Sequence, residues 1–170
     1  MANSKITDYT ALSGSGVNTS ADLIEIVDFD VLTNKKISVD NLRIALLSNT
    51  AIVNTLGSDV ALNNTGNFFV GPTCAQGTSG TWYASGSVSL ADPTLAAFTV
   101  KLWDGTTVIA STVISLTGGF NGMVHLSGFI ASPAGNIRIS VKDQTTTGGS
   151  IKFNASGESK DSTLTVVRIG

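Results

Sequence analysis

The sequence predicts an all-β protein on three grounds: strict alternation of apolar and polar residues, turn signals at even spacing, and an abundance of β-branched residues. The clearest alternation lies in residues 81–90, where Trp82, Ala84, Val88 and Leu90 alternate with Tyr83, Ser85, Ser87 and Ser89. Successive side chains of a strand point to opposite faces of a sheet. One face of this strand is therefore expected to be buried and the other to meet water.

Eight segments of this kind follow one another along the chain, at 67–70, 81–90, 97–103, 106–116, 123–130, 136–142, 150–155 and 162–169. Turn signals lie between them, among them Gly71-Pro72, Asp104-Gly105 and Gly148-Gly149. Asp and Gly tolerate positive φ, so Asp104-Gly105 predicts a short hairpin turn. Eight evenly spaced strands predict an eight-stranded jelly-roll β-sandwich over residues 67–170.

Residues 1–48 have a different character. The first 50 residues hold ten of the 22 charged residues of the chain. Residues 22–28 (DLIEIVD) predict a short strand, and Ser38 followed by Asp40 predicts the start of a short helix that carries Leu42 on its apolar face. This segment is too small to enclose a core, so we expect it to dock on a partner. Residues 49–66 lack sustained periodicity and predict a linker or an edge segment.

The composition of the chain argues against several classes of function. Charged residues make up 13% of the 170 residues and the net charge is −2, which argues against a nucleic-acid interface. No apolar run is long enough to span a bilayer, so no membrane partner is expected, and the N-terminal MANSKITDYT lacks the apolar core of a secretory signal. Cys74 is the only cysteine, which excludes an intramolecular disulfide and favours a buried free thiol.

No arrangement of residues predicts catalysis, a metal site or a cofactor, so we expect a protein that is not an enzyme. His125 is the only histidine, and its strand neighbours point to the opposite face, so a hydrogen-bonded strand histidine is favoured over a catalytic one. Asp92, Asp104 and Asp143 lie in turns, where aspartate is expected for backbone reasons. The acidic cluster of Asp22, Glu25, Asp28 and Asp30 lacks the pattern of a calcium loop; a charged strand edge is favoured, and a weak cation site is left open.

Aromatic residues suggest carbohydrate binding as an alternative function, because exposed aromatic rings stack on sugar rings. Tyr83 and Trp103 lie on the polar phase of their strands and are the candidate glycan-binding residues. Trp82 lies on the apolar phase and is expected in the core. A structural role for these rings is favoured, since Trp103 adjoins a turn and can cover the end of a hairpin.

Two groups of segments resemble tailed-bacteriophage virion proteins of the head-fibre, capsid-decoration and tail-fibre type. SKITDYTALSG, ADLIEIVD and TNKKISVDNLRIAL resemble the N-terminal leader of those proteins, and GTWYASGSVSLADP, KLWDGTTVIAS and STLTVVRIG resemble the jelly-roll knob that follows it. The two parts together cover nearly the whole chain. Tyr9 stands where an aliphatic residue is usual, and Glu25 replaces a common proline.

The resemblance implies a homotrimeric knob, made in the host cytoplasm, that the N-terminal segment attaches to other virion proteins such as a major capsid or tail protein. The residues expected at this virion anchor are apolar: Ile6, Leu12, Leu23, Ile24, Ile26, Ile37 and Leu42. The prediction is therefore a non-enzymatic capsid-decoration or head-fibre protein. The alternatives are a receptor- or carbohydrate-binding tip on the same fold, with a host surface glycan as partner, and a glycosidase or depolymerase.

Overall fold

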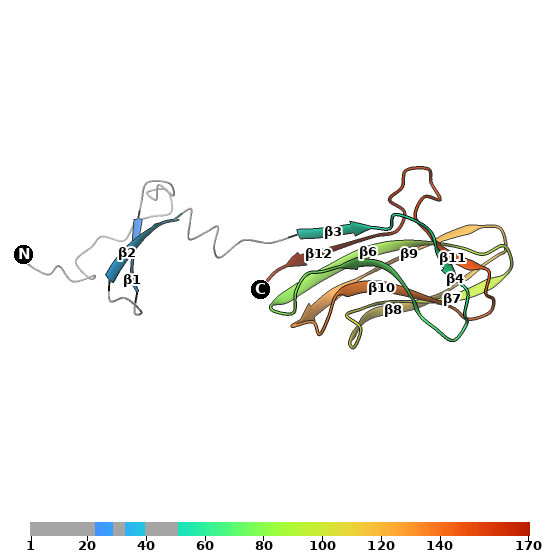
Figure 1. Ribbon diagram of the computed structural model, residues 1–170, viewed down its shortest axis with the longest axis horizontal. Helices are drawn as coiled ribbons and strands as arrows, with labels where there is room; N and C mark the ends of the chain where they lie inside the picture. The colour runs from blue at the N-terminus through green and yellow to red at the C-terminus, as the bar shows by residue number, and fades with distance from the viewer. Residues whose placement is uncertain (1–22, 29–32, 40–50) are drawn as a thin grey trace, which may run out of the picture. The chain divides into compact units, whose positions relative to one another are not determined.

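The computed structural model describes residues 23–28, 33–39 and 51–170, and the chain divides into two compact units, residues 1–48 and 49–170 (Figure 1). In the first unit, β1 (Leu23–Asp28) pairs antiparallel with β2 (Thr33–Ser38), and Ile24 stands opposite Ile37. The strand predicted at residues 22–28 is confirmed over its described part. Of the helix predicted after Ser38, Val39 alone is described, as helical, and the rest falls on residues 40–50, outside the described residues.

The larger sheet of the second unit is built around its longest strands. The central strand β6 (Thr81–Ala91) pairs along its whole length with β9 (Asn121–Ala131). On its other side it pairs with β12 (Thr163–Arg168) and then with β11 (Gly149–Lys152). β3 (Ala51–Thr55) lies beyond β12, and β4 (Val60–Leu62) lies beyond β11. All of these pairs are antiparallel.

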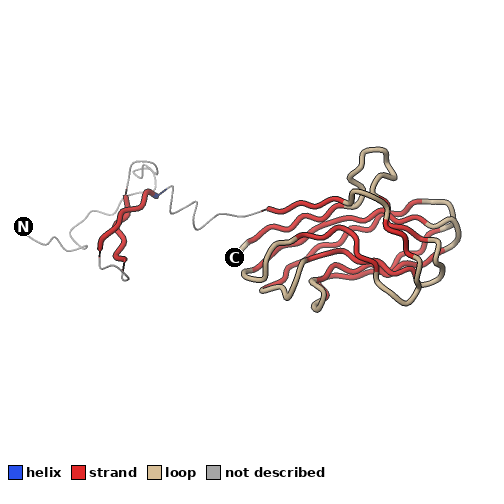
Figure 2. The backbone as a smooth tube through the Cα atoms, in the orientation of Figure 1, coloured by secondary structure: helices blue, strands red, loops and turns tan. Residues whose placement is uncertain are grey.

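The smaller sheet has four strands in the order β5-β10-β7-β8. Their bounds are Phe69–Cys74 for β5, Ile137–Asp143 for β10, Ala96–Trp103 for β7 and Val108–Leu116 for β8. The two sheets face each other as a β-sandwich, with strands along its length and loops at its two ends (Figure 2).

The core confirms the alternation read from the sequence. Trp82, Ala84, Val88 and Leu90 are buried on the inner face of β6, and Phe98, Val100 and Leu102 are buried on the inner face of β7. β10 contributes Ile137, Ile139 and Val141, and β12 contributes Leu164 and Val166. Because the inner-facing residues are mainly apolar, hydrophobic burial holds the two sheets together.

Residues 67–170 contain eight strands, β5 to β12, as predicted, and β3 and β4 within residues 49–66 add two edge strands, so the sandwich has ten. Two expectations about turns need correction. Gly71-Pro72 is not a turn and lies inside β5, where both residues are buried. Asp104-Gly105 is part of a four-residue loop, since Trp103 pairs with Val108 across a register shift. Within this loop the Asp104 carboxylate accepts hydrogen bonds from both Thr106 N and Thr107 N.

Candidate functional site: the distal loops and the cation-aromatic cluster

The register of the larger sheet defines two ends of the sandwich. Ala51, where the chain enters the sandwich, pairs with Val167, and Val167 pairs with Tyr83 near the start of β6. The far end of β6 is Ala91, which pairs with Asn121. The loops at this far end, residues 92–95, 117–120 and 144–148, are called here the distal loops (Figure 1).

Two buried aspartates hold the distal loops together. Asp92 is 2% exposed and Asp143 is fully buried. Thr146 Oγ1 lies 2.5 Å from Asp92 Oδ2 and 2.8 Å from Asp143 Oδ2. Asp92 Oδ1 also accepts from Thr94 N at 2.7 Å, and Asp143 Oδ1 accepts from the backbone N–H groups of residues 145 and 146. These aspartates thus have a structural role, as the sequence indicated for aspartates in turns.

Electrostatics at Asp92 follow from these contacts. Burial raises the pKa of the Asp92 carboxyl, and hydrogen bonds from Thr146 and Thr94 lower it by more, so the net pKa lies below its ordinary value. A hydroxyl has one proton, so Thr146 donates to Asp92 or to Asp143 at any moment, not to both. Near neutral pH the Asp92 carboxyl is therefore ionised. It accepts hydrogen bonds that hold the distal loops and does not donate a proton.

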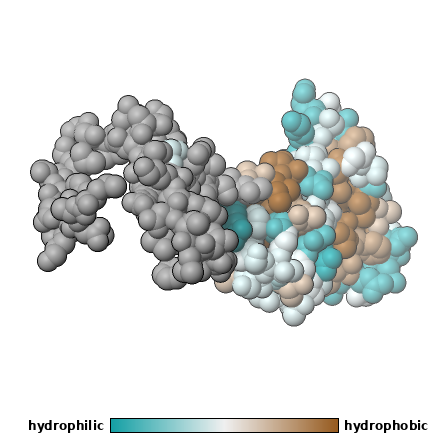
Figure 3. Space-filling view, turned by 60° about the vertical axis from the view of Figure 1, so that its left-hand side comes forward, coloured by the Kyte–Doolittle hydropathy of each residue, from teal (hydrophilic) through white to brown (hydrophobic). Residues whose placement is uncertain are grey.

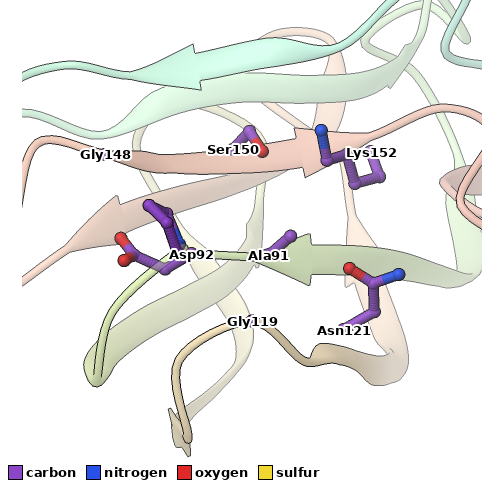
Figure 4. Close-up of a pocket in the computed structure, with 8 residues that line it drawn as sticks. Ala91, Asp92, Gly119, Asn121, Gly148, Ser150 and Lys152 are labelled. Carbon is purple, nitrogen blue, oxygen red and sulfur yellow. The ribbon is translucent and has the colours of Figure 1, made fainter.

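A shallow depression of about 260 Å³ adjoins the distal loops. Figure 4 shows Asp92 and Asn121 on opposite sides of it, with Ser150 and Lys152 of β11 along a third side. Lys152 Nζ is held by Asp59 Oδ2 at 2.7 Å, and Asp92 by Thr94 and Thr146. The other polar side chains that line the depression are the exposed amide of Asn121 and the hydroxyl of Ser150. These two groups suit weak hydrogen bonding to a hydroxylated ligand.

A cation-aromatic cluster covers the outer face of the smaller sheet. It consists of Phe68, Trp103, Lys101, Arg138 and Lys142. Lys101 Nζ lies 3.3 Å from the Trp103 ring centroid and 3.9 Å from that of Phe68. Arg138 Cζ lies 4.9 Å from the Trp103 centroid, and Lys142 Nζ lies 5.5 Å from that of Phe68. The strand register explains the arrangement, because Trp103 pairs with Arg138 and Lys101 pairs with Ser140, to which the Trp103 indole donates at 2.9 Å.

The cluster is electropositive. Burial lowers the pKa of Lys101, and the neighbouring charges of Arg138 and Lys142 lower it further. Within residues 51–170 the one ion pair is Lys152–Asp59, so the three cations of the cluster have no carboxylate partner. The Nε of Arg138 is buried without a hydrogen bond. This arrangement can attract an anionic group.

The two candidate glycan-binding residues do not come together. Trp103 lies on the outer face of the smaller sheet, with its ring covered by Lys101. Tyr83 lies on the outer face of the larger sheet, where its ring centroid is 4.9 Å from that of Phe129. The two rings cannot contact one sugar because the core separates them. The sequence analysis did not single out the basic members of the cluster, Lys101, Arg138 and Lys142. The signal that could have indicated them is the polar phase of β7, which Lys101 shares with Trp103.

The remaining residues singled out in the sequence have structural surroundings. His125 Nε2 lies 3.2 Å from Ser85 Oγ on the outer face of the larger sheet, which confirms a hydrogen-bonded strand histidine. Cys74 is a buried free thiol, as expected, and burial raises its pKa to about 11. The Cys74 thiol donates to Leu164 O at 3.4 Å, so it is not an activated nucleophile.

The N-terminal candidates are only partly described. Leu23, Ile24 and Ile26 lie on β1 and Ile37 lies on β2. Ile6, Leu12 and Leu42 lie outside the described residues. Of the acidic cluster, Glu25 and Asp28 lie on β1, with Glu25 opposite Lys36, and Asp22 and Asp30 lie outside.

Among the described residues, no group of three or more His, Cys, Asp and Glu side chains gathers in a way that could hold a metal ion. No helix in that part of the chain has the length and apolar character needed to cross a membrane.

Comparisons with known proteins give weak structural likenesses alone. No family model matches the chain, and no curated protein matches it in sequence. Among solved structures, Eiger TNF from S. frugiperda is 8% identical, with 72% of this chain and 93% of that chain covered and a TM-score of 0.46. The C-terminal CBM6 of LamC, a marine laminarinase from Zobellia galactanivorans, is 14% identical, with 70% and 100% covered and a TM-score of 0.40.

A third likeness is to VP2 of infectious bursal disease virus, in a subviral particle. It is 14% identical, with 91% of this chain and 42% of that chain covered and a TM-score of 0.39. At these scores the likenesses assign no family.

Proposed function

We propose that this chain is a non-enzymatic bacteriophage virion structural protein, a capsid-decoration or head-fibre protein. Its N-terminal segment attaches it to the virion, and residues 67–170 form a trimeric jelly-roll knob. The observation that carries this proposal is the division into a small N-terminal unit and a β-sandwich of residues 49–170. The leader that resembles those of virion proteins coincides with the small unit.

The entry point of the chain agrees with this role. β3 begins at the end of the sandwich opposite the distal loops, because Ala51 pairs beside Val167 and Tyr83 while Ala91 pairs with Asn121. A sandwich tethered through residues 49–50 can therefore present its distal loops away from the tether.

The test is deletion of residues 1–48. We expect the remaining chain to keep the circular dichroism and thermal transition of a folded β-sandwich, because its core lies wholly within residues 49–170. The truncated protein should fail to bind particles that lack the native copy, as measured by cosedimentation. Full occupancy of particles by the truncated protein would contradict the anchoring role of residues 1–48.

A second candidate function is binding of a host surface glycan, and the cation-aromatic cluster favours it. Three cations without carboxylate partners beside two aromatic rings suit an acidic saccharide, since the cations can pair with its carboxylate or sulfate groups. Trp103 suits this role better than Tyr83, because Lys101 and Arg138 lie over the Trp103 ring while the Tyr83 ring packs against Phe129.

The expected outcome is that Trp103→Ala and Lys142→Ala each weaken binding to an acidic polysaccharide such as heparin by at least about fivefold. Tyr83→Ala is the matched aromatic control and should bind as the native protein does. Equal retention of all variants and native protein on a heparin column across a salt gradient would exclude the cluster as a glycan site.

A further inference from the structure

The two sheets end side by side in two long edge strands, β8 and β9. In the described structure, β8 pairs only with β7, and β9 pairs only with β6. A Cβ on Gly128 would lie 2.6 Å from Ile109 Cγ2, and a Cβ on Gly122 would collide with Leu116. The small glycines of β9 therefore let β8 pack directly against it. The surface formed by β8, β9 and residues 117–120 is called here the β8–β9 flank.

The β8–β9 flank is apolar and almost without charge. Nine large hydrophobic residues are exposed among the described side chains, and five of them border the exposed edges of β8 and β9: Val108, Val113, Phe120, Met123 and Phe129. Met123 and Phe129 share the outer face of the larger sheet with Tyr83, and Val113 shares the outer face of the smaller sheet with Thr99, so these side chains border the two edges from opposite sides. From Gly105 to Ile137 the sequence holds no Asp, Glu, Lys or Arg, and His125 is its one ionisable residue. On the face that Figure 3 shows, apolar residues of the sandwich gather in contiguous areas.

The other edge strands of the sandwich are protected in ways that this flank is not. β3 has five residues and β4 has three, so each offers few unpaired backbone groups. β5 has six residues and contains Pro72. β8 and β9 have nine and eleven residues, with no proline and no Lys or Glu. Monomeric β proteins usually shield long edges by charge, proline or shortness, because open edges pair with other chains.

We propose that the β8–β9 flank is the surface through which copies of this chain associate with one another. This inference deepens the proposed function, because it names the interface of the expected oligomeric knob. The occupant is a second copy, since an uncharged edge meets its own counterpart without like-charge repulsion and its unpaired backbone groups are self-complementary. A charged partner would find no complementary charge on it.

The size of the flank fits such an interface. At about 3.3 Å per residue the eleven residues of β9 extend for about 36 Å, and two sheets about 10 Å apart with their side chains make the flank about 20 Å thick. The resulting area of about 700 Å² is close to the ~800 Å² per partner that a stable interface of ordinary size buries.

The test places one lysine on each strand of the flank, as Val113→Lys and Met123→Lys in the full-length chain. Both side chains are exposed, at 59% and 63%, so the fold should tolerate the change. The matched control is Val70→Lys, which makes the same substitution on β5, at the opposite edge of the same sheet, at a residue 47% exposed. Circular dichroism melting verifies that each variant is folded.

We expect sedimentation velocity to show an oligomer for the native protein and for Val70→Lys. The two flank variants should dissociate, with dissociation constants raised at least about a hundredfold, because an unpaired lysine would be buried at the interface. A native mass of one chain at all concentrations would overturn the proposal, and so would flank variants that keep the native mass. Attachment of the same variants to particles, measured separately, reports on the N-terminal anchor and distinguishes failure of this interface from failure of the proposed function.

Discussion

Buried aspartates fix the loops at both ends of the sandwich. Asp104 is 3% exposed and accepts hydrogen bonds from the backbone N–H groups of Thr106, Thr107 and Ala134 at 2.8, 2.6 and 2.7 Å. Its carboxylate thereby joins residues 104–107 to the loop that follows β9. Asp92 and Asp143 have the same role in the distal loops. In each case the carboxylate accepts hydrogen bonds from backbone N–H groups of the loops and so fixes their conformation.

Asp104→Ala should lower the free energy of unfolding by about 2–4 kcal/mol at pH 7, because three N–H groups lose a charged acceptor. Burial raises the pKa of the Asp104 carboxyl, and the N–H donors lower it by more, so its folded pKa lies below the ordinary value. Its contribution is therefore complete above the unfolded pKa of about 3.9 and is lost as pH falls through the lower folded pKa. Urea unfolding at pH 7 and at pH 3 measures both effects.

The exposed Asp59 provides the control for this prediction. Asp59→Ala should cost less than about 1 kcal/mol, since Asp59 forms an exposed pair with Lys152. An Asp104→Ala variant as stable as Asp59→Ala at pH 7, or one equally destabilised at pH 3 and pH 7, would contradict the assigned role of the Asp104 carboxylate.

Single residues were predictable where one local rule determined their surroundings. The sequence predicted that Trp82 and Cys74 are buried and that aspartates in turns serve the backbone, and the structure confirms all three. It could not show that Tyr83 and Trp103 lie on opposite faces, because the pairing of β6 and β7 with their neighbours is set by contacts distant in sequence. The grouping of Lys101, Arg138 and Lys142 depends on the same register.

Strands were predictable according to their length. Long alternating strands such as β6, β7 and β10 were found within a residue or two of their bounds. For residues 49–66 the sequence left a linker and an edge segment open, because the five residues of β3 and the three of β4 are too few for a periodic pattern to emerge from a polar segment. β5 was cut short because Gly71-Pro72 is a usual turn signal, whereas on this edge strand the missing N–H of proline is tolerated.

Gly86 in the middle of β6 marks a close approach between strands. A Cβ at this position would lie 2.6 Å from Thr163 O and 3.0 Å from Ile139 Cδ1. Gly86→Ala should therefore lower the free energy of unfolding by about 1–3 kcal/mol, since β12 or the facing sheet must shift. Thermal and urea unfolding measure the loss. Gly57→Ala is the matched control because nothing lies within 4 Å of its added Cβ, and a similar loss in both variants would refute the steric explanation.

At the scale of the whole molecule, the chain divides into two compact units, residues 1–48 and 49–170. The density of charged residues in the sequence changes near residue 50. The independence of the sandwich core from residues 1–48 is the physical reason to expect that their deletion leaves it folded. The edge position of β8 and β9 could not be predicted, because only the complete strand order reveals which strands lack a second neighbour.

The pairing of β3 with β12 has a mechanical consequence. The connection to the N-terminal unit continues directly into β3, which is joined to β12 through five register pairs from Thr55 to Ala51. Hydrogen bonds of an antiparallel pair run perpendicular to the strands. A pull transmitted from residue 50 while the distal loops are held would load these bonds together, in shear, rather than opening them one after another. The sandwich is thus attached in the direction in which a short strand best resists force.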